Sequence, residues 1–300
     1  MAILLALPIS VGIEAIEAFK KVDDSVGKLI FAHFRSVKES ALVYVVGVTD
    51  DDLRIAFHNA GKVGPSELER LLLVIAAQSP RVIGVDFDTA DKSFQNLACE
   101  SFYGAHVIWA RKSRTSMVDG KTFMYPVLGG DPGVPSALVA LPEEQGVIRS
   151  YQQCFETGSG RAWFLSQAMV HTRDSPPVCG EWKEGKFVPD YCPIGYHPRA
   201  AIYNITAAKL LDGRAPRLQD QAVLLGGKFH ALDEFQTPVG AMNGVELLAQ
   251  VTETADAPRE PPKSLVIPVV YLCALLVVTP FISPADFWRA TTTALVILVC

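Results

Sequence analysis

The stretch SELERLLLVIAAQSPRVIGVDFD, residues 66–88, decides the fold that this sequence predicts. In its first half, apolar side chains recur at the three- and four-residue spacing of an amphipathic helix. The stripe consists of Leu68, Leu71, Leu72 and Ile75. Ser66 is a suitable N-cap, and Glu69 follows three residues later as its capping-box partner. The sequence therefore predicts a helix that begins near Ser66 and buries one face.

Two carboxylates follow this helix, at the end of a predicted strand. Pro80 cannot continue the helix, and residues 82–85 are apolar without alternation, as in a strand that is covered on both faces. The strand runs directly into Asp86 and Asp88. Because ligands of open α/β sheets bind at the carboxyl ends of the strands, this acidic strand end is our first candidate for a binding site.

The alternation of strands and helices continues on both sides of this unit. Residues 42–48 predict a strand before the helix, so that residues 42–88 have the length of a right-handed parallel crossover. Further strands are predicted at 105–110 and 222–225, and a helix at 244–254. Weaker patterns predict helices at 14–34, 94–102, 162–171 and 206–211, and strands at 146–150 and 202–205. Together they predict an α/β domain with a mostly parallel or mixed sheet in a three-layer α/β/α arrangement.

Apolar segments at both ends suggest a membrane protein. The mean hydropathy of +0.23 is high for a chain with 20% charged residues. Residues 264–282 are uncharged and long enough to cross a bilayer as a helix, and residues 286–300 resemble the start of a second membrane helix. The apolar residues 1–13 fit a truncated span, a signal-type segment, or a buried segment of a soluble domain. The globular body is then predicted to cover residues 14–256.

Charge and cysteine usage narrow the class of protein. A net charge of −5 leaves no basic face suited to nucleic acid. Four of the six cysteines lie between the apolar ends, and an even number there favours an oxidising compartment. Cys179 and Cys192 flank a Pro- and Gly-rich excursion, which predicts a disulfide between them; four reduced, buried thiols are the alternative. Closely spaced ligand pairs are absent from the sequence, so we predict no metal site.

Two motifs invite a catalytic interpretation. Gly226 and Gly227 follow an apolar run and could bring backbone amides to an anion, although such glycines more often make a turn. Residues 86–89, DFDT, resemble the first motif of the haloacid dehalogenase phosphohydrolases, whose first carboxylate attacks phosphorus. That chemistry also needs a lysine and a distal acidic pair, and the candidates, Lys228 and the pair Asp233-Glu234, would both have to come from one loop. We therefore predict no enzyme activity and no cofactor.

Four stretches resemble the CHASE2 family, the extracytoplasmic sensory domain of bacterial receptors. They are LVYVVGVTDDDL at 42–53, RVIGVDFDTADKSF at 81–94, GVIR at 146–149, and residues 220–250 with VLLGG and NGVELLAQ. The resemblance implies a domain in the inner (cytoplasmic) membrane, with its body outside the cytoplasm and membrane helices behind it. It also implies a homodimer, or a subunit of a membrane complex.

In this interpretation a ligand of unknown identity binds at the carboxyl ends of the strands. The candidate residues are Asp86, Asp88, Arg149, Gly226, Gly227, Asp233 and Thr237. One departure from the family stands out, because residues 62–65, KVGP, replace its usual Trp-Pro-Arg element. This departure favours a second hypothesis, in which the same domain is a docking surface of a structural or assembly subunit.

Overall fold

The computed structural model describes eleven ranges of the chain: 43–58, 61–99, 102–115, 122–130, 134–143, 146–157, 160–171, 179–183, 186–196, 203–229 and 233–256. All of them belong to the first of two units, Met1–Ala257 and Pro258–Cys300. The predicted helix at 14–34 and the predicted membrane segments at 1–13, 264–282 and 286–300 lie outside these ranges. Among the described helices, none combines the length and the apolar character that a bilayer span requires.

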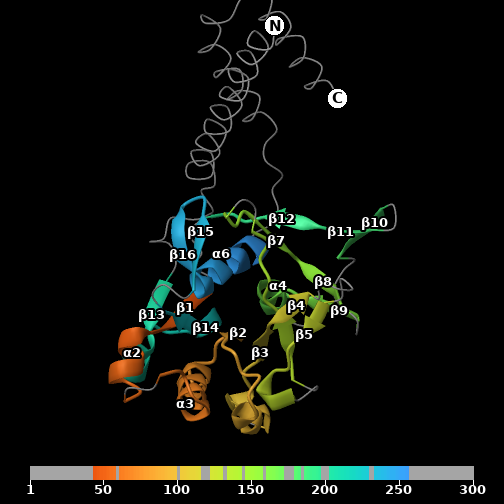
Figure 1. The fold of residues 1–300 in the computed structure, drawn as a ribbon. Helices are drawn as coiled ribbons and strands as arrows, with labels where there is room; N and C mark the ends of the chain where they lie inside the picture. Colours follow the sequence, from red (N-terminus) through yellow and green to blue (C-terminus); the bar gives the residue numbers. More distant parts are fainter. Residues whose placement is uncertain are drawn as a thin grey trace, which may run out of the picture. The chain divides into compact units, whose positions relative to one another are not determined.

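Six parallel strands form the centre of the domain (Figure 1). In spatial order they are β13 (Tyr203–Thr206), β1 (Val43–Thr49), β14 (Ala222–Lys228), β2 (Val82–Asp86), β3 (Val107–Arg111) and β6 (Ser136–Leu138). Every pairing is parallel. The predicted α/β class with a mainly parallel sheet is therefore confirmed. Strand β14 lies between β1 and β2, so a late segment of the chain completes the sheet formed by the early ones.

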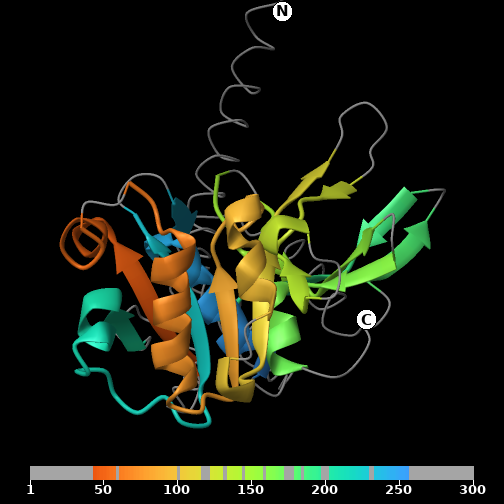
Figure 2. The same cartoon turned by 90° about the horizontal axis from the view of Figure 1, so that it is seen from below.

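Helices cover both faces of this sheet (Figure 2). One face carries α3 (Pro65–Ala76), α5 (Ala207–Leu211) and the 3-10 helices η1 (Lys92–Cys99) and η2 (Phe102–Gly104). The other carries α4 (Leu165–Val170) and α6 (Gly244–Asp256). Each face has its own buried apolar cluster, and the strands contribute alternate side chains to the two. The helix predicted at 94–102 is instead the 3-10 helix η1, which begins two residues earlier and ends three residues earlier.

The stripe predicted for α3 is confirmed, but its predicted start is wrong. Leu68 and the three other apolar residues of the stripe are fully buried. The helix begins at Pro65, with Gly64 as its N-cap and without a side-chain capping bond. Proline suits the first helical position because its φ is already helical and its missing N–H would have no partner there. Ser66 instead donates its hydroxyl proton to Glu67, at 3.1 Å.

The other described strands form antiparallel ribbons, most of which lie in polar stretches for which the sequence predicted no element. Within the described ranges these two-stranded sheets are β4–β5 (Ser113–Thr115, Thr122–Met124), β7–β12 (Ser150–Gln152, Tyr191–Pro193), β8–β9 (Cys154–Thr157, Gly160–Trp163), β10–β11 (Gly180–Lys183, Lys186–Pro189) and β15–β16 (Glu234–Thr237, Gly240–Asn243). Ribbons β4–β5 and β10–β11 extend away from the helices and the central sheet (Figure 2). The 3-10 turn η3 (Leu128–Gly130) lies between β5 and β6.

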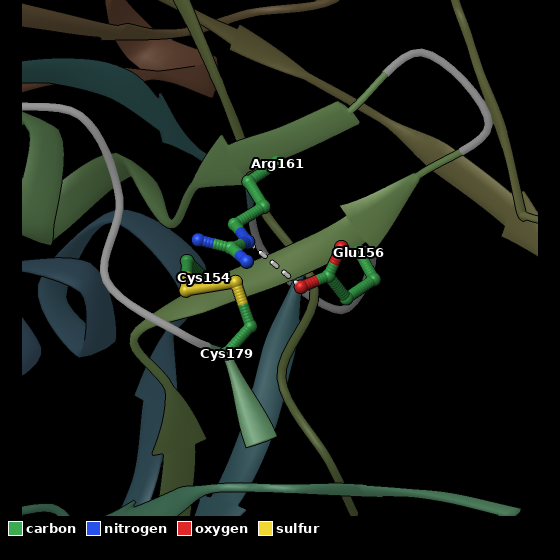
Figure 3. Close-up of a disulfide and its surroundings, with 4 residues drawn as sticks. All are labelled: Cys154, Glu156, Arg161 and Cys179. Carbon is green, nitrogen blue, oxygen red and sulfur yellow. Dashed lines mark hydrogen bonds and ion pairs between the residues drawn. A yellow bond between two sulfur atoms is a disulfide. The ribbon is translucent and has the colours of Figure 1, made fainter. Parts of the chain in front are cut away.

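The predicted Cys179–Cys192 disulfide is wrong. Cys179 is bonded to Cys154, which places the bridge between the starts of β10 and β8 (Figure 3). Cys192 is a buried thiol, and its sulfur accepts a hydrogen bond from the Gln153 side chain at 3.2 Å. The excursion between Cys179 and Cys192 is closed by backbone pairing of β10 with β11, so it needs no bridge across its base.

Residues 50–52, the three aspartates within the family-like stretch 42–53, form the first turn of a short helix, α2 (Asp50–Ile55). Thr49 caps this helix, and one Asp52 oxygen accepts hydrogen bonds from both the amide and the hydroxyl of Thr49, each at 2.8 Å. The other Asp52 oxygen accepts from the amide of Ala208 in α5, at 2.9 Å. Asp52 is almost fully buried, so its carboxylate ties the carboxyl end of β1 to a helix far away in the sequence.

Replacing Asp52 by alanine should lower the free energy of unfolding by about 2–3 kcal/mol, because a cap and a buried inter-element hydrogen bond are lost together. Asp51→Ala is the matched control: its ion pair with Arg54 is exposed, and its loss should change stability by less than about 0.5 kcal/mol. Urea denaturation followed by tryptophan fluorescence measures both. Equal effects of the two substitutions would contradict this role of Asp52.

Candidate functional site

Asp86 ends β2 beside Gly226 of β14, on the face of the sheet that α6 covers. A Cβ built on Gly226 would lie 2.8 Å from the Val245 side chain and 3.3 Å from the Cβ of Asp86. A larger residue at Gly226 would therefore push the first turn of α6 away from the sheet. Glycine at this position allows the helix to start close against β14, next to Asp86.

Asp233 reaches the same place from the other direction. It precedes β15, and its backbone carbonyl accepts a hydrogen bond from the amide of Gly244 at 3.1 Å. Its carboxylate oxygens lie 2.7 and 2.8 Å from the position that a Cβ on Gly244 would take. Asp86 and Asp233 thus meet at the amino end of α6, where the helix dipole favours negative charge.

Lys112 completes this acidic edge, by which we mean Asp86, Asp88, Asp233 and Lys112. It follows β3 directly, and its Nζ lies 3.6 Å from the Asp88 carboxylate, with both side chains 62% exposed. Its positive charge also lowers the pKa values of Asp86 and Asp233. Lys112 was not among the predicted site residues, although its position just after a predicted strand is the signal that identified the two aspartates.

Burial disfavours the ionisation of two carboxyl groups of the acidic edge, those of Asp86 and Asp233. The pKa of Asp86 rises from 3.8 to about 6, chiefly through desolvation and then through the negative charge of Asp233. The pKa of Asp233 is also raised by burial, against the opposing effects of the Gly244 amide and Lys112. Mildly acidic solution therefore changes the charge of Asp86 in the folded protein.

The acidic edge offers carboxylate oxygens together with the exposed positive charge of Lys112. Such a set can accept hydrogen bonds from the hydroxyl or ammonium groups of a small ligand, while Lys112 can pair with an acidic group on the same molecule. Among the described residues there is no group of three or more His, Cys, Asp or Glu side chains that could hold a metal ion.

Three of the predicted site residues lie elsewhere or have another role. Thr237 donates its hydroxyl proton to the carbonyl of Gly240 at 2.6 Å, within the turn of the β15–β16 hairpin. Arg149 lies near Tyr196, whose hydroxyl donates to the carbonyl of Ile148, and it does not contribute to the pKa shifts of Asp86 or Asp233. Gly227 is covered by the Phe229 ring, so it makes room for a side chain rather than an open anion site.

Fold and site together define a class: an α/β domain with a mainly parallel sheet and a candidate ligand site at the carboxyl ends of its strands. The chain belongs to the CHASE2 domain family, whose sequence profile matches residues 2–282 of its 300 residues. CHASE2 is an extracytoplasmic sensory domain family, consistent with a sensor role and with placement outside the cytoplasm. Comparisons with curated proteins and with solved structures found no match.

The raised pKa of Asp86 predicts how stability depends on pH. The folded protein binds the Asp86 proton more tightly than the unfolded chain does, so this contribution to stability is complete below about pH 4 and is lost as pH rises through about 6. Asp86→Asn cannot ionise. As the pH rises from 4.5 to 7.5, the wild type should therefore lose roughly 1–2 kcal/mol of stability relative to this variant, on the scale set by the pKa shift of Asp86.

Thermal unfolding at these two pH values measures this difference. Asp88→Asn is the matched control, because it makes the same chemical change two residues away on an exposed side chain. If Asp86→Asn differs from the wild type by the same amount at both pH values, the assigned environment of Asp86 is wrong.

Proposed function

We propose that this chain is a membrane-anchored sensor of the inner membrane, and that a small ligand binds at the acidic edge outside the cytoplasm. One observation carries this proposal. Asp86 and Asp233 come from separate elements and converge on the first turn of α6, the last described helix before the apolar C-terminal segment. A group bound there contacts the sheet and α6 at once.

The direction of α6 supports the route that we propose for the signal. Its amino end lies at the acidic edge, and its carboxyl end leads into residues 257–263 and the predicted membrane helix at 264–282. Its first nine residues, 244–252, are all buried, and the helix packs against β1, β14 and α4. A ligand that prefers one packing of α6 would shift the equilibrium by that difference in affinity and no further.

We also propose that the domain recognises its ligand without transforming it. The phosphohydrolase hypothesis assigned a catalytic lysine to Lys228. That side chain instead forms a 2.7 Å ion pair with Glu246 and contacts Asn204 at 3.4 Å. It contributes neither to the pKa shift of Asp86 nor to that of Asp233, which supports a binding site rather than a reaction centre.

The second hypothesis, a structural subunit, is favoured by one feature of the fold. The β4–β5 and β10–β11 ribbons project from the body and keep outer strand edges that the described residues do not pair (Figure 2). Exposed strand edges are a common means of docking another chain. This hypothesis and the sensor hypothesis assign different surfaces, so the two can be tested separately.

Ligand binding can be tested by thermal shift with a panel of small amines, polyols, amino acids and carboxylates. At a concentration of 100 times Kd, a ligand stabilises its protein by about 2.7 kcal/mol, which raises Tm by about 5–10 °C in a domain of this size. We expect at least one compound to raise Tm of the wild type but not of an Asp86→Asn/Asp233→Asn double variant. Glu156→Gln, which breaks an exposed ion pair with Arg161, is the control and should keep the shift.

A compound that stabilises the double variant equally would place the ligand site elsewhere. Loss of a co-purifying protein on deleting the β10–β11 ribbon, with no response to any compound, would favour the structural subunit.

Placement outside the cytoplasm predicts that Cys154 and Cys179 are oxidised in living cells. Cells are treated with membrane-permeant N-ethylmaleimide before lysis, and the protein is mapped without reduction. We expect the peptides of Cys154 and Cys179 to be joined, and Cys192 to be alkylated only after unfolding because its side chain is buried. Alkylated Cys154 and Cys179 would contradict an extracytoplasmic location, since the cytoplasm keeps such thiols reduced.

A further inference from the structure

A second polar contact holds the first turn of α6, on the side away from Asp86. The Glu246 carboxylate is 3% exposed and pairs with the Lys228 ammonium at 2.7 Å. The Asn204 amide nitrogen lies 3.3 Å from the same carboxylate oxygen, and the Asn204 carbonyl lies 3.4 Å from the Lys228 ammonium. Each of the three side chains therefore contacts the other two.

This three-residue contact spans half the central sheet. Lys228 ends β14, Asn204 lies on the edge strand β13, and β1 runs between them. Gly47 of β1 makes the crossing possible, because a Cβ built there would overlap the Lys228 side chain. The acidic edge lies on the β2 and β3 side of β14. The first turn of α6 is thus held from two sides by different charged groups.

At the carboxyl end of α6 an ion pair is longer and more exposed than the Lys228–Glu246 pair. The Thr254 hydroxyl accepts a hydrogen bond from the amide of Gly195 at 2.9 Å. Asp256 lies 3.8 Å from Arg81, and these two side chains are 19% and 41% exposed. A solvent-exposed ion pair of this length contributes little to stability, whereas removing one partner of a buried pair leaves an uncompensated charge.

We propose that the Lys228–Glu246–Asn204 contact is a fixed pivot for α6, so that occupation of the acidic edge moves the carboxyl half of the helix rather than its first turn. The signalling role rests on the proposed function. The pivot is a property of the domain without ligand, because all three side chains and Gly47 belong to the folded body. Lys228, Glu246 and Asn204 act through α6 and are positioning residues.

Hydrogen exchange of the full chain, followed by mass spectrometry, tests the pivot without any ligand. We expect backbone amides at 247–250 to exchange at least about tenfold more slowly than those at 253–256 in the wild type. Glu246→Gln and Lys228→Met should each speed exchange at 247–250 by about tenfold, with less than a twofold change in α3. Lys228→Arg keeps the charge and should retain most of the protection.

Asn204→Ala tests the same contact if the charge variants fail to fold. It removes one partner of Glu246 without leaving a buried charge unpaired, and it should speed exchange at 247–250 by about threefold. Arg81→Ala is the control for the other end, and it should affect only residues 253–256. The pivot is refuted if Asn204→Ala, Glu246→Gln and Lys228→Met leave exchange at 247–250 unchanged, or if they speed both ends of α6 equally.

The result of the hydrogen-exchange test does not depend on the result of the ligand-binding test of the proposed function. Asp86→Asn should abolish ligand stabilisation while changing exchange at 247–250 by less than about twofold. If no ligand is found, the exchange results still decide the pivot. If the pivot fails, the effect of Asp86→Asn on ligand binding still stands.

Discussion

Close packing of α6 on the centre of the sheet is the constraint on which the site depends. It is possible because β14 carries glycine at the point where the helix begins, and Val245 occupies the space that a side chain at Gly226 would need. Without that approach, Asp86 would face solvent rather than the start of a helix. The desolvation of Asp86 is the largest cause of its raised pKa, and it follows from the packing of the Val245 side chain on the backbone of β14.

The order of the strands explains why distant segments of the sequence share one site. Strand β14 is late in the chain but lies between β1 and β2, so the loop after it reaches the end of β2. Asp233 and Asp86 are 147 positions apart (233 − 86) and meet at the first turn of α6. In a parallel sheet all strand ends of one kind share an edge, which is why a simple search for polar residues after strands found both aspartates.

What the sequence predicted well was local, and what it missed depended on distant contacts. The stripe led by Leu68 was recognisable because its spacing alone determines which face is buried. The pairing of Cys179 could not be derived, since the spacing of four cysteines leaves three connectivities open. Thr237 lies in the β15–β16 hairpin rather than on a strand of the central sheet, and its hydroxyl closes the hairpin turn.

The departure of this chain from its family can also be located. Residues 62–65 stand where the family's Trp-Pro-Arg element is expected, and they contain the N-cap Gly64 and the first residue of α3. Val63 in this stretch packs into the apolar cluster on the α3 face. Asp86 lies on the opposite face, under α6. A change at 62–65 therefore alters the covering of one face while the acidic edge keeps its geometry. The α3 face and the acidic edge can therefore differ from the family independently of each other, because the sheet that separates them is packed on both faces.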